Sequence, residues 1–253
     1  MTRGQLLFVV LNAAFVTFLL MAELTGAKLF QIPTEGWPIL PVLGISALTL
    51  TMGVVPFPFT FLITDLLNEY YGRRLVRFTT LVGTACITLA FGVIYVGREI
   101  PAASFSNVGD AEFNTVFLNS EVIIIASVIA YMIGQMVDIQ VFHKLRVWTK
   151  DRHIWLRATG STVVSQILDS YIVIFLAFHY LASEASQKSL ELCFEIATTN
   201  LIYKLAIAIG MTPIIYLGHW ALDRFLGREG IELRERALAG ANRTYGARAN
   251  SSG

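Results

Sequence analysis

Ionisable and amide side chains stand inside several of the most apolar segments of this chain. In chain order they form the groups Asp65-x-x-Asn68-Glu69, Gln135-x-x-Asp138, Ser165-Gln166-x-x-Asp169 and Asn200-x-x-x-Lys204. A charge in hydrocarbon is costly, so such a group usually faces a protein interior or an aqueous cavity and marks a substrate or ion pathway. Carboxylates and amides supply the acceptors and donors that hold a polar small molecule. The pattern therefore predicts a polar binding pocket between helices.

The first group has the spacing of one helix face. Asp65, Asn68 and Glu69 fall at positions i, i+3 and i+4, which lie next to one another on a helix. The alternative is an ordinary helix end, with Gly72 as the C-cap residue and Glu69 paired with Arg73 one turn on. For Asp138, which comes shortly before a basic loop, the corresponding alternative is a pairing with Lys144 or Arg146 at the membrane interface.

The last two groups contain the strongest candidates. Asp169 is in the middle of an apolar stretch, with no Lys or Arg near it in sequence, and it ends a polar stripe that also contains Ser165 and Gln166. Lys204 is either the counter-ion of Asp169 or Asp138, or a direct contact of the substrate; a charge pair without a ligand role is the alternative. At the end of the first apolar stretch, Glu23 is interpreted as interfacial.

Composition places the chain among membrane proteins. Only 15% of its 253 residues are charged and 55% are hydrophobic, whereas soluble domains contain roughly 25% charged residues. The net charge of +1 gives no reason to expect nucleic-acid binding. The two cysteines, Cys86 and Cys193, are expected to be packing residues. No metal-binding or cofactor motif is present, and no paired nucleophile and base indicates an enzyme.

The apolar stretches predict an all-α integral membrane protein, a bundle of six transmembrane helices. Five stretches are about as long as the roughly 20 residues that one crossing needs, at residues 5–22, 75–97, 118–141, 157–181 and 193–219. Region 37–71 is the sixth. Within it, Pro56-Phe57-Pro58 predicts one crossing with a broken helix, and a re-entrant segment followed by a half-helix is the alternative.

Lysine and arginine are concentrated in alternate loops and in the tail, which predicts a multi-pass protein with both termini in the cytoplasm. Two parts are expected. Residues 1–222 would form the transmembrane domain, and residues 223–253 a cytoplasmic arginine-rich tail, partly disordered from Arg243 on, with a short surface helix between Leu226 and Leu238.

Three motifs resemble the queuosine precursor transporter family, also called the vitamin uptake transporter family. They are Phe57-Pro-Phe-Thr-Phe-Leu-Ile-Thr-Asp65-Leu-Leu-Asn68-Glu69-Tyr-Tyr-Gly72, Gly134-Gln135-x-x-Asp138, and Arg157-x-x-Gly160-Ser161-x-x-x-Ser165-Gln166-x-x-Asp169-Ser170. The resemblance extends from about Glu23 to Tyr216. It implies a bacterial inner-membrane protein of six helices that takes up 7-cyano-7-deazaguanine or its 7-aminomethyl relative. It also implies a fold like that of the substrate-binding components of energy-coupling vitamin transporters.

The chemistry of such a base fits the polar groups. The edge of a deazaguanine offers an N–H and an NH2 side by side, and one carboxylate accepts both in a bidentate way. The carbonyl oxygen of the base needs a donor, such as Asn68, Gln135, Gln166 or Lys204. The sequence leaves open which carboxylate contacts the base, whether protons drive transport, and whether the chain forms a homo-oligomer. An alternative function is the substrate-binding subunit of an ATP-energised uptake complex.

Overall fold

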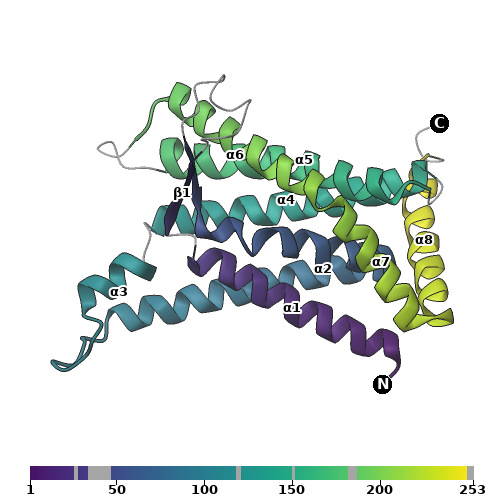
Figure 1. Cartoon of the computed structure of the whole chain (residues 1–253), viewed down its shortest axis with the longest axis horizontal. Helices are drawn as coiled ribbons and strands as arrows, with labels where there is room; N and C mark the ends of the chain where they lie inside the picture. Colours follow the sequence, from purple (N-terminus) through teal and green to yellow (C-terminus); the bar gives the residue numbers. More distant parts are fainter. Residues whose placement is uncertain (26–27, 34–46, 118–120, 150–151, 182–186, 250–253) are drawn as a thin grey trace.

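The structure is a computed structural model and describes all residues except 26–27, 34–46, 118–120, 150–151, 182–186 and 250–253. The described part is a bundle of long helices with a small strand pair at one end (Figure 1). In chain order, its elements are α1 (Arg3–Thr25), β1 (Leu29–Pro33), β2 (Ala47–Thr51), η2 (Met52–Val54), α2 (Phe57–Arg98), α3 (Asp110–Phe117), α4 (Glu121–Trp148), α5 (Ile154–Phe175), the π-helical turn η3 (Leu176–Tyr180), α6 (Leu190–Gly210), α7 (Thr212–Leu226) and α8 (Arg228–Ala249). The predicted helical membrane class is confirmed.

Helix α2 is two helical arms that meet at Gly72. This glycine has φ 74° and ψ 173°, which breaks the helix at a conformation that favours glycine. The first arm runs antiparallel to α1, because Tyr71 donates a hydrogen bond to the Gly4 carbonyl and Phe59 stacks on Phe18. The second arm returns along α1 towards α3 (Figure 1). The two arms correspond to the second and third crossings expected from sequence.

Pro56 and Pro58 were predicted to break a helix in its middle, and this prediction is wrong, because both stand at the start of α2. Pro56 stands at the N-cap of α2 and a proline occupies the first turn, where the missing N–H removes no helical hydrogen bond. The residues before it were expected to be helical, but Ala47–Thr51 pairs as the antiparallel strand β2 with β1. The first part of the expected crossing, at residues 37–46, lies outside the described residues.

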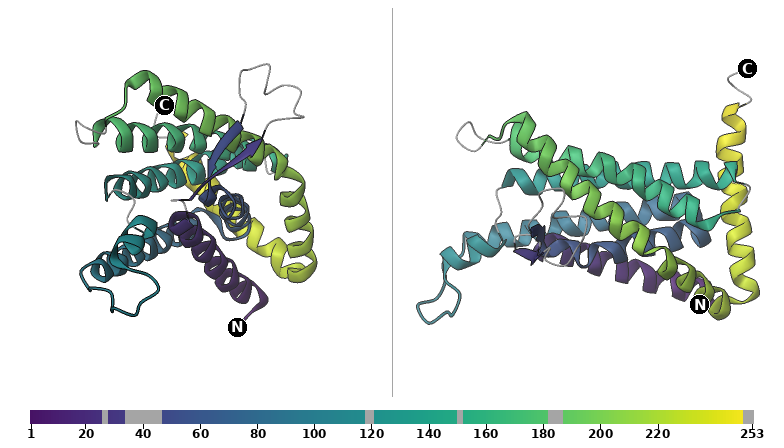
Figure 2. Two further views of the ribbon diagram at one scale, coloured as in Figure 1. Left: turned by 60° about the vertical axis from the view of Figure 1, so that its left-hand side comes forward. Right: turned by 45° about the horizontal axis from the view of Figure 1, so that its top comes forward.

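The other helices pack in chain order. Helix α4 lies along α5, and α5 lies along α6 (Figure 2). Helices α4 and α5 meet at Gly134, where an added Cβ would make an ordinary van der Waals contact, 3.5 Å from the Cβ of Asp169. The last expected crossing along the chain, residues 193–219, is not one helix. Helix α6 ends at Gly210, and α7 starts at Thr212 with a proline in its first turn.

Four helical segments of the described chain are long and apolar enough to cross a membrane: Arg3–Thr25, Met52–Arg98, Ile154–Tyr180 and Leu190–Gly210. The second is 47 residues long and includes both arms of α2. Helix α4 has 28 residues, also enough for one crossing. Large apolar side chains such as Leu89 and Val93 are more than 60% exposed, as expected for residues that face lipid. These findings support a multi-pass membrane protein.

Helix α8 crosses the end of the bundle near the N-terminus (Figure 2). It packs against the Gly72 bend, where a Cβ would come 3.2 Å from Ala237. Arg146 of α4 donates a hydrogen bond to the Arg234 carbonyl, and the Gly4 amide donates one to Glu229. The helix expected between residues 226 and 238 therefore continues to Ala249 and docks on the bundle.

Candidate functional site

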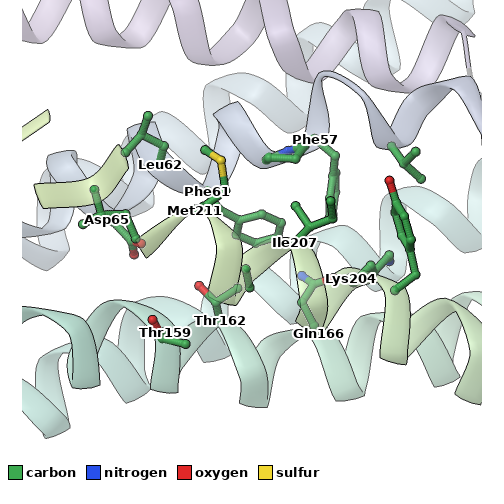
Figure 3. A pocket seen from close by; sticks show the side chains of 15 residues that line it. Phe57, Phe61, Leu62, Asp65, Thr159, Thr162, Gln166, Lys204, Ile207 and Met211 are labelled. Carbon is green, nitrogen blue, oxygen red and sulfur yellow. The ribbon is translucent and has the colours of Figure 1, made fainter. Parts of the chain in front are cut away.

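A pocket lies between the first arm of α2, α5, and the α6–α7 break (Figure 3). Three of the predicted site residues line it: Asp65, Gln166 and Lys204. Its remaining walls are mainly apolar and aromatic, from residues that include Phe57, Phe61, Leu62, Tyr203, Ile207 and Met211. The cavity volume is about 30 Å³, which is room for one or two water molecules. A few polar groups on an apolar wall are typical of a small-molecule site.

Local sequence explains why these side chains converge. Prolines start α2 at the outer edge of the pocket, so Asp65 comes two turns into the helix and not at its frayed end. On α5, Thr159, Thr162 and Gln166 recur at helical spacing and present one polar stripe towards α2 (Figure 3). The break after Gly210 lets Met211 and the start of α7 close the pocket.

Asp65 is the carboxylate of the pocket. It is 2% exposed, and its Oδ1 atom has no hydrogen-bond partner within the described part of the protein. It lies within electrostatic range of Asp138, Glu69 and Arg157. A buried acceptor without a partner costs free energy. Asp65 is therefore well placed to accept donors from a bound molecule.

Gln166 on α5 and Lys204 on α6 supply further polar atoms to the pocket wall. Gln166 is 3% exposed, and its Oε1 atom has no partner among the described residues. The Lys204 ammonium donates to Asp169 Oδ2 at 2.6 Å and lies 5.0 Å from the centroid of the Phe57 ring. Lys204 is thus the counter-ion of Asp169, as one interpretation of the sequence had it, and it also lines the pocket, while its contact with substrate stays a prediction.

A second charged group lies deeper, towards α8. Arg157 Nη2 is 2.7 Å from Glu69 Oε1, and Arg146 Nη2 is 3.8 Å from the same oxygen. All three side chains are about 1% exposed or less. Arg146 also donates to the backbone carbonyls of Asn68 and Glu69 near the end of the first arm. These contacts tie α2, α4 and α5 together.

The remaining predicted residues do not line the pocket; they are Asn68, Gln135, Asp138, Ser165 and Asn200. Ser165 donates to Asp138 Oδ1 at 3.3 Å between α5 and α4. Asn68 and Gln135 are buried and have side-chain atoms without partners among the described residues, yet neither lines the pocket. Asn200 is also absent from the pocket wall, and its amide donates to the Ile196 carbonyl of its own helix.

Sequence reasoning missed two contributions to the polar interior. Glu23 was expected at the interface, but its carboxylate accepts a hydrogen bond from Ser127 of α4, at 3.0 Å and 3.3 Å to its two oxygens, and lies within electrostatic range of Asp169 and Lys204. Arg157 was noted only as the first residue of the third family motif. Its sequence could have indicated this role, because Arg157 is an arginine among small residues at the start of an expected crossing. An arginine buried there needs an anion as its partner. Within the described residues, no group of His, Cys, Asp or Glu is arranged to hold a metal ion.

Comparison with known proteins gives consistent matches. The model of a family described as "Putative vitamin uptake transporter" matches residues 51–218. A "Probable queuosine precursor transporter" of Bacillus subtilis is 33% identical over 136 residues, 53% of this chain and 58% of the relative. The "Queuosine precursor transporter" of Escherichia coli is 31% identical over 163 residues, 63% of this chain and 67% of the relative. No solved structure matches the chain at a significant level.

Proposed function

From the premise that the chain belongs to the vitamin uptake transporter family, we propose that it imports queuosine precursors. The substrates would be 7-cyano-7-deazaguanine, 7-aminomethyl-7-deazaguanine or both. The names of the relatives support a transporter for this class of compound, and a transporter family agrees with the expectation that the chain is not an enzyme. The names do not favour the alternative of a binding subunit within an ATP-energised complex.

The observation that carries this proposal is the meeting of Asp65, Gln166 and Lys204 in one aromatic-walled pocket. The Asp65 carboxylate would accept the ring N–H and the amino group of the base. Lys204 would donate to the carbonyl oxygen of the base, and Phe57 and Phe61 would cover its flat faces. Asp65 is preferred over Asp169 for this role, because Asp169 is already paired with Lys204 whereas Asp65 has an oxygen without a described partner.

The pocket must open to accept a base. A cavity of about 30 Å³ is smaller than a bicyclic base, so the walls would have to separate during binding. The wall elements that end at proline-containing breaks, the start of α2 and the α6–α7 junction, are the natural places for this movement. Broken helices next to a substrate site are a recurring feature of transporters.

The topology that fits this function has six crossings, made by α1, the two arms of α2, α4, α5 and α6. Both termini and α8 would then lie in the cytoplasm of a bacterial inner membrane. The arginine-rich α8 and the basic end of α4 support this orientation, since cytoplasmic segments are rich in Lys and Arg. The likeness to substrate-binding components of energy-coupling vitamin transporters stays a proposal on the same footing.

Ligand-induced thermal stabilisation tests the proposal. The purified protein would be heated with 7-cyano-7-deazaguanine, its aminomethyl relative, guanine and riboflavin, because a ligand that binds the native state raises its apparent stability. We expect stabilisation by a deazaguanine. Asp65→Asn should weaken it by about 10-fold or more, since a hydrogen bond to a charged group contributes roughly 1.5–3 kcal/mol.

Asp110→Asn is the matched control, because it makes the same chemical change at the exposed first residue of α3. It should bind the base like the native protein. Absence of stabilisation by either deazaguanine would count against the substrate class. Equal stabilisation of native protein and Asp65→Asn would leave the substrate class standing and remove Asp65 from the site.

A further inference from the structure

A group of polar side chains lies beside the pocket, towards the end of the bundle that carries β1 and α3. It consists of Glu23 on α1, Tyr131 on α4, Asp169 on α5 and Lys204 on α6, and we call it the outer polar cluster. Lys204 Nζ is 2.6 Å from Asp169 Oδ2. Glu23 lies within electrostatic range of both. Three helices, α1, α5 and α6, thus place two carboxyl groups and one ammonium group together, and α4 adds the Tyr131 hydroxyl.

The buried hydroxyl of Tyr131 is a second observation that points to a proton or cation bound in the cluster. The side chain is 6% exposed, and its hydroxyl has no hydrogen-bond partner among the described residues. It is one turn from Ser127, which binds Glu23, and three residues before Gly134, which packs on Asp169. The hydroxyl lies within electrostatic range of Glu23 and Asp169. A buried hydroxyl within electrostatic range of two carboxyl groups is a donor and acceptor available to a bound proton or cation.

The charges of the cluster do not balance among the described side chains. With both carboxyl groups ionised, Glu23 and Asp169 carry two negative charges and Lys204 carries one positive charge. An uncompensated charge in a membrane interior is expensive. One added proton makes the cluster neutral.

We propose that the outer polar cluster binds one proton and that this proton drives uptake of the base. This inference rests on the proposed function. In the proton-bound state, one proton from the outer solution would be held by the Glu23 or Asp169 carboxyl group, with Tyr131 hydrogen-bonded beside it. The same proton would leave to the cytoplasm with the base, and no covalent bond of the base would change.

Lys204 is the physical link between proton and base. Its ammonium pairs with Asp169 in the cluster, and its side chain also lines the pocket. When Asp169 takes up the proton, Lys204 loses its partner charge and becomes available to the carbonyl oxygen of the base. When the base binds Lys204 first, Asp169 gains affinity for the proton. Linkage requires that the two effects be equal.

Among the described residues, few other titratable side chains stand on the elements around the cluster. Asp65 of the first arm of α2 shares the pocket with Lys204. The part of α2 beyond Arg77, which packs on α1, has Cys86 and Tyr95 as its titratable side chains before Arg98. On α6, Tyr203 adjoins Lys204 and lines the pocket. The turn η2 carries none. A pH effect on transport that Glu23→Gln removes would therefore report on the cluster.

The test is uptake of labelled 7-cyano-7-deazaguanine into liposomes that contain the purified chain. Counterflow without any ion gradient measures transport itself. An acid-outside pH gradient should then drive accumulation, limited to about 10-fold per pH unit for one proton, since one pH unit corresponds to about 1.36 kcal/mol. Glu23→Gln should keep counterflow and lose accumulation. Glu99→Gln, the same change at an exposed residue after α2, should keep both.

The outcomes separate the two proposals. Counterflow that is absent with the native chain refutes the proposed function, and the proton site with it. Counterflow without a response to the pH gradient refutes the proton site alone, as does accumulation driven by a sodium gradient at equal pH. Accumulation by Glu23→Gln equal to that of the native chain also refutes it. Should Glu23→Gln fail to fold, Tyr131→Phe takes its place, with reduced accumulation and retained counterflow as the expected result.

Discussion

Replacement of Arg157 by methionine should be among the most destabilising single changes in this chain. Arg157 and Glu69 are each 1% exposed and meet at 2.7 Å. Removing one partner of a buried ion pair typically costs about 3–5 kcal/mol, because the other charge stays buried without compensation. Arg146 lies 3.8 Å from the same Glu69 oxygen and would compensate in part. We therefore expect a loss of about 3 kcal/mol in the free energy of unfolding.

The double variant Glu69→Gln with Arg157→Met separates the charge from the packing. It removes the stranded carboxylate, so it should be more stable than Arg157→Met alone, although two side chains have changed. The difference is the coupling between the residues, which a double-mutant cycle measures. Unfolding of the purified protein by sodium dodecyl sulfate in mild detergent micelles gives the free energies that the cycle needs.

Arg236→Met is the matched control. Arg236 also pairs with a glutamate, Glu232 at 3.3 Å, but the two side chains are 75% and 62% exposed. Exposed pairs of this spacing contribute about 0.3–0.5 kcal/mol. The reasoning fails if Arg157→Met costs no more than Arg236→Met, or if the double variant is less stable than Arg157→Met. Either result would mean that the Glu69 charge is not shielded from water.

Three further predictions concern the bend, the tail and one excluded residue. Gly72→Ala should destabilise the protein by about 1–3 kcal/mol in the same unfolding assay, because the position has φ 74° and a Cβ would come 3.2 Å from Ala237. Hydrogen bonds from the Thr2 side chain and from the Gly4 amide lower the pKa of Glu229. Docking of α8 on the N-terminus should thus be strongest above the ordinary glutamate pKa and weaken as pH falls through the lowered value; proteolysis of α8 that is equally pH-dependent in Glu229→Gln would contradict this. Asn200→Ala should change affinity for the base less than twofold in a binding titration, because the amide bonds its own helix; a 10-fold loss would place Asn200 in the site.

The helical elements were largely predictable, and the errors have one physical cause. Hydropathy identifies segments that avoid water, and it placed α1, α4, α5 and the second arm of α2 close to their observed ranges, whereas the first arm starts at Phe57, 20 residues later than the expected start at residue 37. It does not say where a helix starts within such a segment. Pro56 was predicted to break a helix within a crossing, and Pro213 was not considered, but both mark helix starts, where proline is well tolerated. The strand pairing of β2 depends on β1, which lies outside the segment that was considered.

The sequence allowed us to predict which polar side chains are buried more readily than which of them form ion pairs with one another. Helical spacing predicted that Asp65 and Glu69 share a helix face, as do Gln166 and Asp169. In the structure only Asp65 and Gln166 of these four line the pocket, whereas Glu69 and Asp169 are held in ion pairs. Which charge meets which is decided by the order and tilt of the helices, and neither can be derived from spacing. Glu69 was weighed against Arg73 one turn away, yet its described partner Arg157 is 88 residues away. The role of Glu23 escaped notice for the same reason, since its contacts are on three other helices.

The two ion pairs of α5 differ in a way that bears on transport. Arg157 joins α5 to α2 through side chains that are 1% exposed, whereas Asp169 joins α5 to α6 through Lys204 with exposures of 12% and 18%. Separating Arg157 from Glu69 would leave two charges buried away from water. The pair of Asp169 and Lys204, in contrast, already has partial access to solvent. The free-energy cost of opening is therefore lower on the α6 side. That side also carries the break at Gly210 and the pocket wall at Lys204. Movement of α6 relative to an α2–α5 unit is thus the opening that costs least and that changes the pocket and the outer polar cluster together.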